Sequence, residues 1–209
     1  MRILIADDHA VVRQGLKQIL ADNFPDSEFG EAGNAGEVID CAWKQEWDVV
    51  VLDITMPGRS GLEALKELRQ ARPKLPVLVL SAHPEDQYAV RVLKAGASGY
   101  MTKDRAPEEL VQAVKKVLDG GKYVSPLLAE KLVTQLHSDT GQPPHETLSD
   151  REFQVLRMIA TGKALKEIAV ELSLSEKTVG TYHIRLLEKM RMHSDVDLTR
   201  YAIEHRLVD

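Results

Sequence analysis

The stretch VVVLDITMPGRSG, residues 49–61, is an aliphatic run that ends abruptly in a carboxylate. Four consecutive aliphatic residues lead directly into Asp53, and a Pro–Gly pair follows at residues 57–58. Because aspartate often opens turns, Asp53 could simply be a turn residue. It could instead be a reactive group that a buried strand holds at the edge of a sheet. The ends of the other predicted strands are needed to choose between these two interpretations.

Short aliphatic runs alternate with amphipathic helical patterns over residues 1–122. Near-continuous aliphatic strands that alternate with helices are typical of a parallel sheet covered by helices on both faces. Five such units predict an α/β fold, a doubly wound (βα)5 domain. The predicted strands are residues 3–6, a weaker one near Phe29, and residues 49–52, 77–80 and 99–101.

The rest of the chain follows a different pattern. Residues 123–146 contain a short helical stretch near 126–136 and then HSDTGQPPHET, whose Gly, Pro and polar residues predict a linker. No strand pattern appears over residues 147–209, where a small all-α domain of four helices is expected. The first helix opens with a Ser-x-x-Glu capping box at Ser149, and the others are expected near residues 165–172, 176–190 and 195–204.

The composition restricts the class of protein. A chain of 209 residues with 44% hydrophobic and 28% charged residues is ordinary for a globular protein. No apolar stretch approaches the ~18 residues that span a bilayer, and the acidic pair near the start leaves no room for a signal peptide. The single Cys41 excludes an internal disulfide and a cysteine-based zinc site. These features predict a cytoplasmic protein with no membrane partner.

The net charge of the chain gives little support to a large basic surface that binds nucleic acid. The net charge is −5, and residues 147–209 contain ten Lys and Arg against ten Asp and Glu. Proteins that bind DNA usually carry a basic surface. Any DNA binding by the helical domain must therefore depend on a local face of it.

Polar side chains follow four of the five predicted strands. In a doubly wound sheet, functional groups gather beyond the carboxyl ends of the strands. Alone, Asp7 or Asp8 could cap a helix, Ser81 could be a turn residue and Lys103 a solvated lysine, so only their joint placement is informative. The first strand ends at Asp7 and Asp8, the third at Asp53 and the fourth at Ser81, and the fifth leads through Tyr100 to Lys103.

Three carboxylates at one edge predict a cation site. Two carboxylates ~4 Å apart repel each other by about 4 kcal/mol at an effective dielectric near 20. An all-oxygen site with open water positions suits Mg²⁺, which would neutralise Asp53 as a phosphoryl group approaches. Lys103 and Ser81 would then bind the transferred oxygens.

The segments ADDH, VVVLDITMPGRSGLEAL, LSAH and KAGASGYMTKD resemble the receiver domains of bacterial two-component response regulators. The resemblance implies a CheY-like fold with strand order 2-1-3-4-5. It implies that Asp53 accepts a phosphoryl group from a phosphohistidine on a sensor histidine kinase. It also implies that Asp8, Asp53 and the backbone carbonyl of Thr55 bind Mg²⁺, with Asp7 acting indirectly.

The same resemblance assigns further roles. Ser81 and Tyr100 form the switch pair: Ser81 moves to bond a phosphoryl oxygen, and Tyr100 then moves in from the surface. Thr55 and His83 border the attacking water and tune the lifetime of the phosphorylated state, although His83 could be only a loop residue. Many receivers carry a cis proline after the lysine, and Asp104 stands there in this chain, which leaves the geometry of that bond open.

Residues 164–190, ALKEIAVELSLSEKTVGTYHIRLLEKM, predict a helix-turn-helix. Ser175 is placed to cap the second helix, on which four polar residues are expected to face outward. Small hydroxyls and cations at a helix start suit phosphate and base contacts in a major groove. A plain helical bundle with a solvated face explains this pattern equally well. The four outward residues are Lys177, Thr178, Thr181 and Arg185.

The longer string from Leu148 to Met190, with DLTRYAIEH after it, is similar to the LuxR/FixJ-type DNA-binding domain. The chain thus resembles a NarL/FixJ-class response regulator, and LSLSEKTVGTY leans toward the GacA/UvrY-like members. The resemblance places base contacts at Gly180, Thr181 and Ile184. Many relatives carry Lys at the first of these positions and a basic or polar residue at the third. Gly180 costs ~1 kcal/mol of helix stability against Ala, and it would allow a close approach to DNA.

The predicted function is a transcription factor that phosphorylation controls, and not an enzyme. Phosphorylation would form a homodimer that binds double-stranded promoter DNA, with the last helix, residues 196–203, as the contact between DNA-binding domains. A phosphatase with an aspartyl-phosphate intermediate is one alternative, but the second acid of an Asp-x-Asp-x-Thr motif is absent after Asp53. A protein-interaction adaptor that does not touch DNA is another. The acidic residues at the predicted strand ends argue against a third alternative, a regulator that senses a small molecule.

Overall fold

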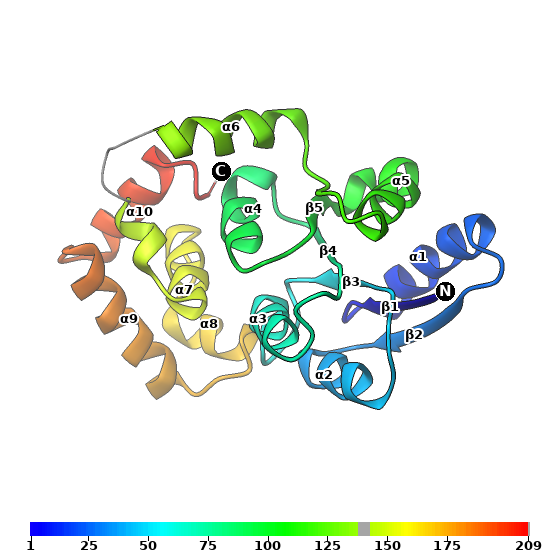
Figure 1. Cartoon of the computed structure of the whole chain (residues 1–209). Coiled ribbons are helices and arrows are strands. Elements are labelled where there is room, and N and C mark those ends of the chain that lie inside the picture. Colours follow the sequence, from blue (N-terminus) through cyan, green and yellow to red (C-terminus); the bar gives the residue numbers. More distant parts are fainter. Residues whose placement is uncertain (138–142, 209) are drawn as a thin grey trace. The chain divides into compact units, whose positions relative to one another are not determined.

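The structure, a computed structural model, describes residues 1–137 and 143–208. It divides into two compact units, Met1–Leu136 and His137–Asp209, which are coloured from blue to green and from yellow to red in Figure 1. The predicted domain limits at residues 122 and 146 stay predictions. Among the described helices, none combines the length and the apolar character needed to cross a bilayer.

The first unit contains a five-stranded parallel sheet with the order β2-β1-β3-β4-β5. The predicted fold and strand order are therefore confirmed. In the ladder, Asp53 lies opposite Leu80, and Ser81 lies opposite Thr102. The polar residues that end these strands thus lie along one edge of the sheet. The strands are β1 (Arg2–Ala6), β2 (Glu28–Ala32), β3 (Val49–Asp53), β4 (Val77–Ser81) and β5 (Gly99–Thr102).

Helices cover both faces of this sheet. Figure 1 shows α1 and α5 together on one side and α2, α3 and α4 on the other. On the first side, Leu16 and Leu20 of α1 and Leu110 of α5 pack against buried strand residues such as Ile5 and Val51. Because successive strand residues point to opposite faces, this two-sided burial explains the uninterrupted aliphatic runs. These helices are α1 (Ala10–Asn23), α2 (Ala35–Lys44), α3 (Gly61–Ala71), α4 (Glu85–Lys94) and α5 (Ala106–Leu118), with a 3₁₀ turn, η1 (Lys103–Arg105), before α5. A further helix, α6 (Pro126–His137), follows them in the chain.

Local sequence explains where α2 and α3 begin. The side chain of Asn34 accepts a hydrogen bond from the Glu37 amide at the start of α2. Ser60 and Glu63 form a reciprocal capping box at the start of α3, which satisfies two amides that the helix itself cannot bond. The second cap places the start of α3 directly after the loop that follows Asp53.

The chain returns to the free edge of β5 after α5. Tyr123 forms a parallel bridge with Gly99; the Tyr100 amide donates to the Tyr123 carbonyl, and the Tyr123 amide donates to the Ser98 carbonyl, both at 3.0 Å. A Cβ on Gly99 would lie only 2.7 Å from the Tyr123 oxygen, so the close approach requires glycine. This bridge covers part of an otherwise open sheet edge.

The second unit is helical and contains the four predicted helices. Ser149 and Glu152 form the predicted capping box, and the side chain of Ser175 accepts from the Thr178 amide at 3.1 Å. Ser173, with a φ of 54°, makes the turn before the third helix. The core consists of fully buried side chains such as Leu156. The elements are η2 (Pro144–Thr147), α7 (Asp150–Ala160), α8 (Leu165–Glu171), α9 (Glu176–Met190) and α10 (Asp195–Glu204).

Candidate functional site

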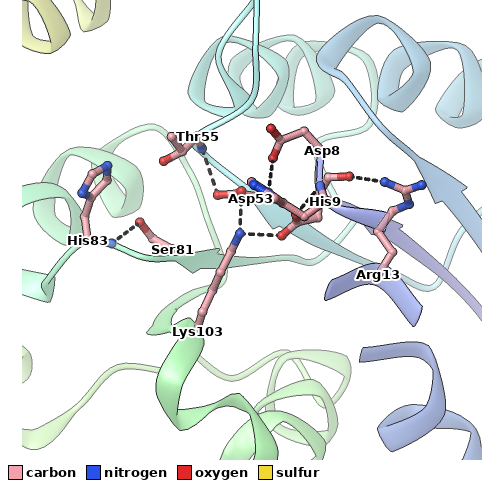
Figure 2. A network of polar contacts seen from close by, with 9 residues as sticks. Asp8, His9, Arg13, Asp53, Thr55, Ser81, His83 and Lys103 are labelled. Atoms are coloured by element: carbon pink, nitrogen blue, oxygen red, sulfur yellow. Dashed lines mark hydrogen bonds and ion pairs between the residues drawn. The ribbon is translucent and has the colours of Figure 1, made fainter. Parts of the chain in front are cut away.

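Asp53 lies at the end of β3, where its carboxylate is 2% exposed. One oxygen, Oδ1, accepts a hydrogen bond from the Thr55 amide at 2.9 Å, and Oδ2 accepts one from the Lys103 ammonium at 2.7 Å; Figure 2 shows both. Burial raises the pKa of the Asp53 carboxyl, and the two hydrogen bonds offset only part of that effect. Asp53 is thus a buried acid, and a further cation beside it would stabilise its ionised, carboxylate form.

A pair of acids, Asp7 and Asp8, follows β1. Asp7 is 1% exposed, and its Oδ1 accepts a hydrogen bond from the His9 amide at 2.9 Å. Its Oδ2 lies 2.6 Å from the Lys103 nitrogen, and Asp8 Oδ1 lies 2.8 Å from Nδ1 of His9. Neither of these two buried oxygens accepts a well-aligned hydrogen bond from any described residue, although a nitrogen is close to each. Buried carboxylate oxygens that lack full hydrogen bonding fit a hard divalent cation such as Mg²⁺.

His9 is a member of this cluster that the sequence reasoning missed. The possible ligand atoms of Asp7, Asp8 and His9 all lie within 4.8 Å of one another. The expected metal set of Asp8, Asp53 and the Thr55 carbonyl does not include His9. The motif ADDH itself was the available signal, because His9 directly follows the acidic pair.

Lys103 connects the two groups of acids. It begins η1, directly after β5, and its ammonium lies within 2.7 Å of both Asp53 and Asp7. Burial alone would lower the pKa of Lys103, but the hydrogen bond to Asp53 and the ion pair with Asp7 raise that pKa above its ordinary value. Lys103 therefore stays charged and holds one positive charge between two buried carboxylates. The Lys103–Asp104 bond is trans, as are the other peptide bonds of the described residues.

The expected switch residues meet at the backbone of His83. Ser81 is buried, and its hydroxyl accepts a hydrogen bond from the His83 amide at 3.0 Å. The hydroxyl of Tyr100 donates to the His83 carbonyl at 2.8 Å, and the His83 ring stacks on Tyr88 with centroids 5.0 Å apart. Tyr100 is fully buried, whereas the family resemblance implies a ring that moves in from the surface. The ring is already inside because the carbonyl satisfies its hydroxyl there.

Arg13 is a second contributor that the sequence reasoning missed. Its Nη1 donates to the backbone carbonyl of Asp7 at 2.7 Å, and its Nε lies 3.3 Å from Glu31. Figure 2 shows the guanidinium beside the loop that carries the acidic pair. The hydrogen bond from Lys17 holds the pKa of Glu31 below its usual range. Arg13 thus anchors the loop after β1, and no local pattern marks a contact of this kind.

In the second unit, α9 presents most of the expected DNA-contact residues to solvent. Lys177, Thr181, Ile184 and Arg185 are exposed, and Ile184 is exposed to 60%. Thr178 and Gly180 are half-buried, and the Thr178 hydroxyl lies 2.7 Å from that of Ser175, so Thr178 belongs partly to the helix cap. The opposite face of α9 is buried through Val179, Leu186 and Met190.

Helix α10 keeps two large aliphatic side chains outside the core. Val196 is exposed to 67% and Ile203 to 56%. Both border a hollow that Ile159 of α7 and Thr199 also line. An apolar surface beside a hollow is a feature of interaction sites.

Comparison with known proteins identifies the chain. Residues 3–115 match the response regulator receiver domain, and residues 146–202 match the luxR family of bacterial regulatory proteins. The chain is a response regulator. It is 38% identical to the response regulator GacA of Pseudomonas aeruginosa over 210 residues, which cover 100% of this chain and 98% of GacA. It is 35% identical to UvrY of Escherichia coli K12 over 208 residues, which cover 99% of this chain and 95% of UvrY.

Solved structures of response regulators resemble this regulator over nearly its whole length. RcsB of Salmonella enterica serovar Typhimurium, bound to promoter rprA in the presence of the phosphomimetic BeF₃⁻, has a TM-score of 0.64 and 27% identity, covering 96% of this chain and 98% of RcsB. A structure of two RcsB dimers bound to two parallel DNAs has a TM-score of 0.59 and 25% identity, covering 100% of this chain and 99% of RcsB. The regulator therefore combines a receiver domain with a LuxR-type DNA-binding domain, and it regulates transcription under the control of phosphorylation.

Proposed function

We propose that Asp53 accepts the phosphoryl group from a sensor histidine kinase, and that this step controls pairing of the regulator on promoter DNA in the cytoplasm. The observation that carries the proposal is the position of Lys103, within 2.7 Å of both Asp53 and Asp7. Asp7 and Asp53 carry two negative charges, and Lys103 neutralises only one of them. A phosphoryl group, which is an anion, therefore needs a further cation at this site. A turn-forming aspartate would need neither this partner nor this burial.

The residues around Asp53 fit Mg²⁺. Asp8, Asp53 and the Thr55 carbonyl are the proposed ligands, and Asp7 acts indirectly. The ion would neutralise the carboxylates and the phosphoryl oxygens, which lowers the repulsion between acceptor and donor. Lys103 binds a second phosphoryl oxygen, and its raised pKa keeps it a cation at neutral pH.

The neighbouring side chains determine how the receiver domain responds to phosphoryl transfer. A phosphoryl group adds roughly two negative charges and three acceptors, and the Ser81 hydroxyl, which now accepts from the His83 amide, would donate to one of them. Because the His83 carbonyl also receives the Tyr100 hydroxyl, a shift of this loop reaches the surface between β4 and β5. Thr55 and His83 border the route of an attacking water, so exchanging both side chains should change the autodephosphorylation rate. An unchanged rate would remove them from this role.

The DNA-binding proposal rests on α9 and α10. The exposed polar residues of α9 contact phosphates and base edges, together with Gly180 and Ile184. The exposed aliphatic residues of α10 join two DNA-binding domains. A domain with no net positive charge binds DNA weakly alone, and pairing increases its affinity through effective concentration.

One experiment tests the whole proposal. The full-length regulator and its Asp53→Asn variant are incubated with Mg²⁺ and acetyl phosphate, then analysed by intact mass and by mapping of the genomic fragments they bind. The wild type should gain the mass of one phosphoryl group and bind a defined set of fragments. The variant should do neither, and an Asp22→Asn control, which alters an exposed aspartate of α1, should behave as the wild type. Phosphorylation of the Asn variant would contradict the assignment of Asp53. Phosphorylation without selective fragment binding would favour an adaptor.

A further inference from the structure

Three neighbouring positions on the outer face of α9 present almost no polar group. Gly180 and Thr181 precede Ile184 by four and three residues, so they adjoin it on the helix surface. Ile184 is a large aliphatic residue in the middle of the helix, and it is exposed to 60%. We call this surface, formed by Gly180, Thr181 and Ile184, the α9 notch.

The hydroxyl of Thr181 does not make the notch polar. It donates a hydrogen bond to the backbone carbonyl of Lys177, one turn back in the same helix, at 3.0 Å. Since the hydroxyl is turned toward the helix, the γ-methyl group is the part of Thr181 left beside Ile184. The notch therefore offers two aliphatic surfaces in place of hydrogen-bonding groups.

No packing among the described residues requires Gly180 to be a glycine. A Cβ built at this position meets nothing within 4 Å, and the backbone conformation there is ordinary helix. Glycine inside a helix nevertheless costs ~1 kcal/mol against alanine. The absence of a side chain at Gly180 leaves open space beside Ile184. A binding partner that approaches the helix closely at this point would explain that space.

Cations flank the notch. Lys177 and Arg185 are both exposed, and neither forms an ion pair with another described residue. A strip with cations at both ends and aliphatic groups between them complements a groove with phosphates on its walls and apolar groups on its floor. In the major groove, that apolar group is the C5-methyl of thymine.

We propose that the α9 notch binds thymine methyl groups in the major groove, so that the regulator reads these bases by apolar contact. The inference rests on the proposed role of α9 in DNA binding and specifies its ligand. Ile184 and the Thr181 methyl contact the thymine, Gly180 lets the base edge approach the helix, and Lys177 and Arg185 contact phosphates beside it. Guanine and adenine are read mainly through hydrogen bonds, which the notch does not offer.

The test compares thymine with deoxyuridine, which differs only in lacking the methyl group. Duplexes are first selected from a random pool by the full-length regulator activated with beryllofluoride. In the best selected duplex, each thymine is then replaced in turn by deoxyuridine, and binding is measured for the wild type, Ile184→Ala and a Val170→Ala control. Val170 is an aliphatic residue of α8, 75% exposed, outside the notch.

The expected result is a loss of about fourfold in wild-type affinity at one or two thymines of each half-site, the effect of one buried methyl group. Ile184→Ala should bind the thymine and deoxyuridine duplexes equally, while Val170→Ala should keep the wild-type ratio. Gly180→Ala should melt at a higher temperature than the wild type and yet bind the selected duplex more weakly. These opposite effects would not arise if Gly180 had only a structural role.

Three results would overturn the inference. Equal wild-type binding to all the deoxyuridine duplexes would exclude methyl recognition. A thymine preference that keeps its wild-type size in Ile184→Ala would show that another part of the protein reads the methyl group. A change in oligomeric state of Ile184→Ala without DNA, measured by sedimentation, would show that the notch binds a second copy of the chain. If the activated regulator selects no duplex at all, the DNA-binding role itself fails, and this outcome is distinct from the other three.

Discussion

At the scale of single residues, the position of Asp53, the proposed phosphoryl acceptor, is unfavourable for stability. Its carboxylate is almost completely buried beside Asp7, and burial raises its pKa. A group whose pKa is higher in the folded state than in the unfolded state stabilises the fold at low pH. That contribution is lost as the pH rises through the folded-state pKa. At neutral pH, the ionised Asp53 therefore lowers the stability of the receiver domain.

The first prediction is that Asp53→Asn stabilises the receiver domain at pH 7. Asparagine has nearly the same shape and removes the buried charge, so the free energy of unfolding should rise by on the order of 1 kcal/mol. The gain should shrink as the pH falls through the carboxyl range, because the wild-type Asp53 then becomes neutral too. Urea unfolding at several pH values measures this difference without added Mg²⁺. A gain that grows toward low pH would contradict the direction given for the Asp53 pKa.

Lys103 gives the second prediction at this scale. Lys103→Met keeps most of the aliphatic stem and removes the only described cation that lies within 2.7 Å of Asp53. The rate of phosphorylation by acetyl phosphate should fall by about 10²-fold, the usual effect of removing one donor to a developing oxyanion. Lys115→Met, which changes an exposed lysine of α5, serves as the control. Equal rates for the two variants would exclude Lys103 from phosphoryl binding.

At the scale of elements, the bridge between β5 and the segment after α5 depends on Gly99. A Cβ there would lie 2.7 Å from the Tyr123 carbonyl oxygen and 2.9 Å from the Tyr123 side chain. The hydroxyl of Tyr123 in turn donates to Glu109 of α5. Burial, with this hydrogen bond, raises the pKa of Tyr123 to about 12, so the donor stays protonated over the physiological range. The edge of β5 is thus tied to α5 through Tyr123.

The third prediction compares two glycines. Gly99→Ala should destabilise the receiver domain by about 1–3 kcal/mol, because the added methyl group forces the strand and Tyr123 apart. Gly15→Ala, in α1, should stabilise it by up to about 1 kcal/mol, since its Cβ would meet nothing within 4 Å. Thermal unfolding of both variants measures the two shifts. If both substitutions shifted the melting temperature in the same direction, the bridge to Tyr123 would not require glycine at position 99.

Periodicity in the sequence predicts the elements well and their polar contacts poorly. All five strands and the four helices of the second unit could be located, because burial on one or two faces leaves a repeating pattern. The strands extend one residue beyond the aliphatic runs at Asp53 and Ser81, since the ladder hydrogen bonds continue there. The bond from Arg13 to the Asp7 carbonyl and the bridge of Tyr123 to Gly99 join residues through the fold. No repeating pattern records such contacts, so they could not be predicted.

The buried state of Tyr100 could not be predicted for a related reason. Its hydroxyl needs a buried acceptor, and that acceptor is the backbone carbonyl of His83, which any residue at position 83 would supply. The sequence gives the type of each side chain, but only the folded backbone determines where the carbonyl of a loop residue points. The convergence of Asp7, Asp53 and Lys103 was therefore predictable from the strand ends, but the conformation of Tyr100 was not.

At the scale of the whole molecule, the proposed DNA binding requires two copies of the regulator to act together. Residues 147–209 have equal numbers of acidic and basic residues, so long-range attraction to DNA contributes little to their affinity. Joining two DNA-binding domains makes the second binding event intramolecular and can increase overall affinity by about 10²–10⁴. The exposed aliphatic residues of α10 are the proposed contact, and phosphorylation of the receiver would supply the pairing.

The fourth prediction separates pairing from DNA contact. Ile203→Asp places a charge on the exposed aliphatic surface of α10 and should weaken binding of the beryllofluoride-activated regulator to a duplex with two half-sites by at least about tenfold, because burying an unpaired charge opposes the contact. Binding to a duplex with one half-site should change little, since Ile203 is not among the proposed DNA contacts. Val170→Asp adds the same charge at an exposed position of α8 and should leave the ratio of the two affinities at its wild-type value. Fluorescence anisotropy with both duplexes gives that ratio directly. If Ile203→Asp weakens both duplexes equally, α10 contributes to DNA contact or folding, and the regulator must pair through its receiver domains alone.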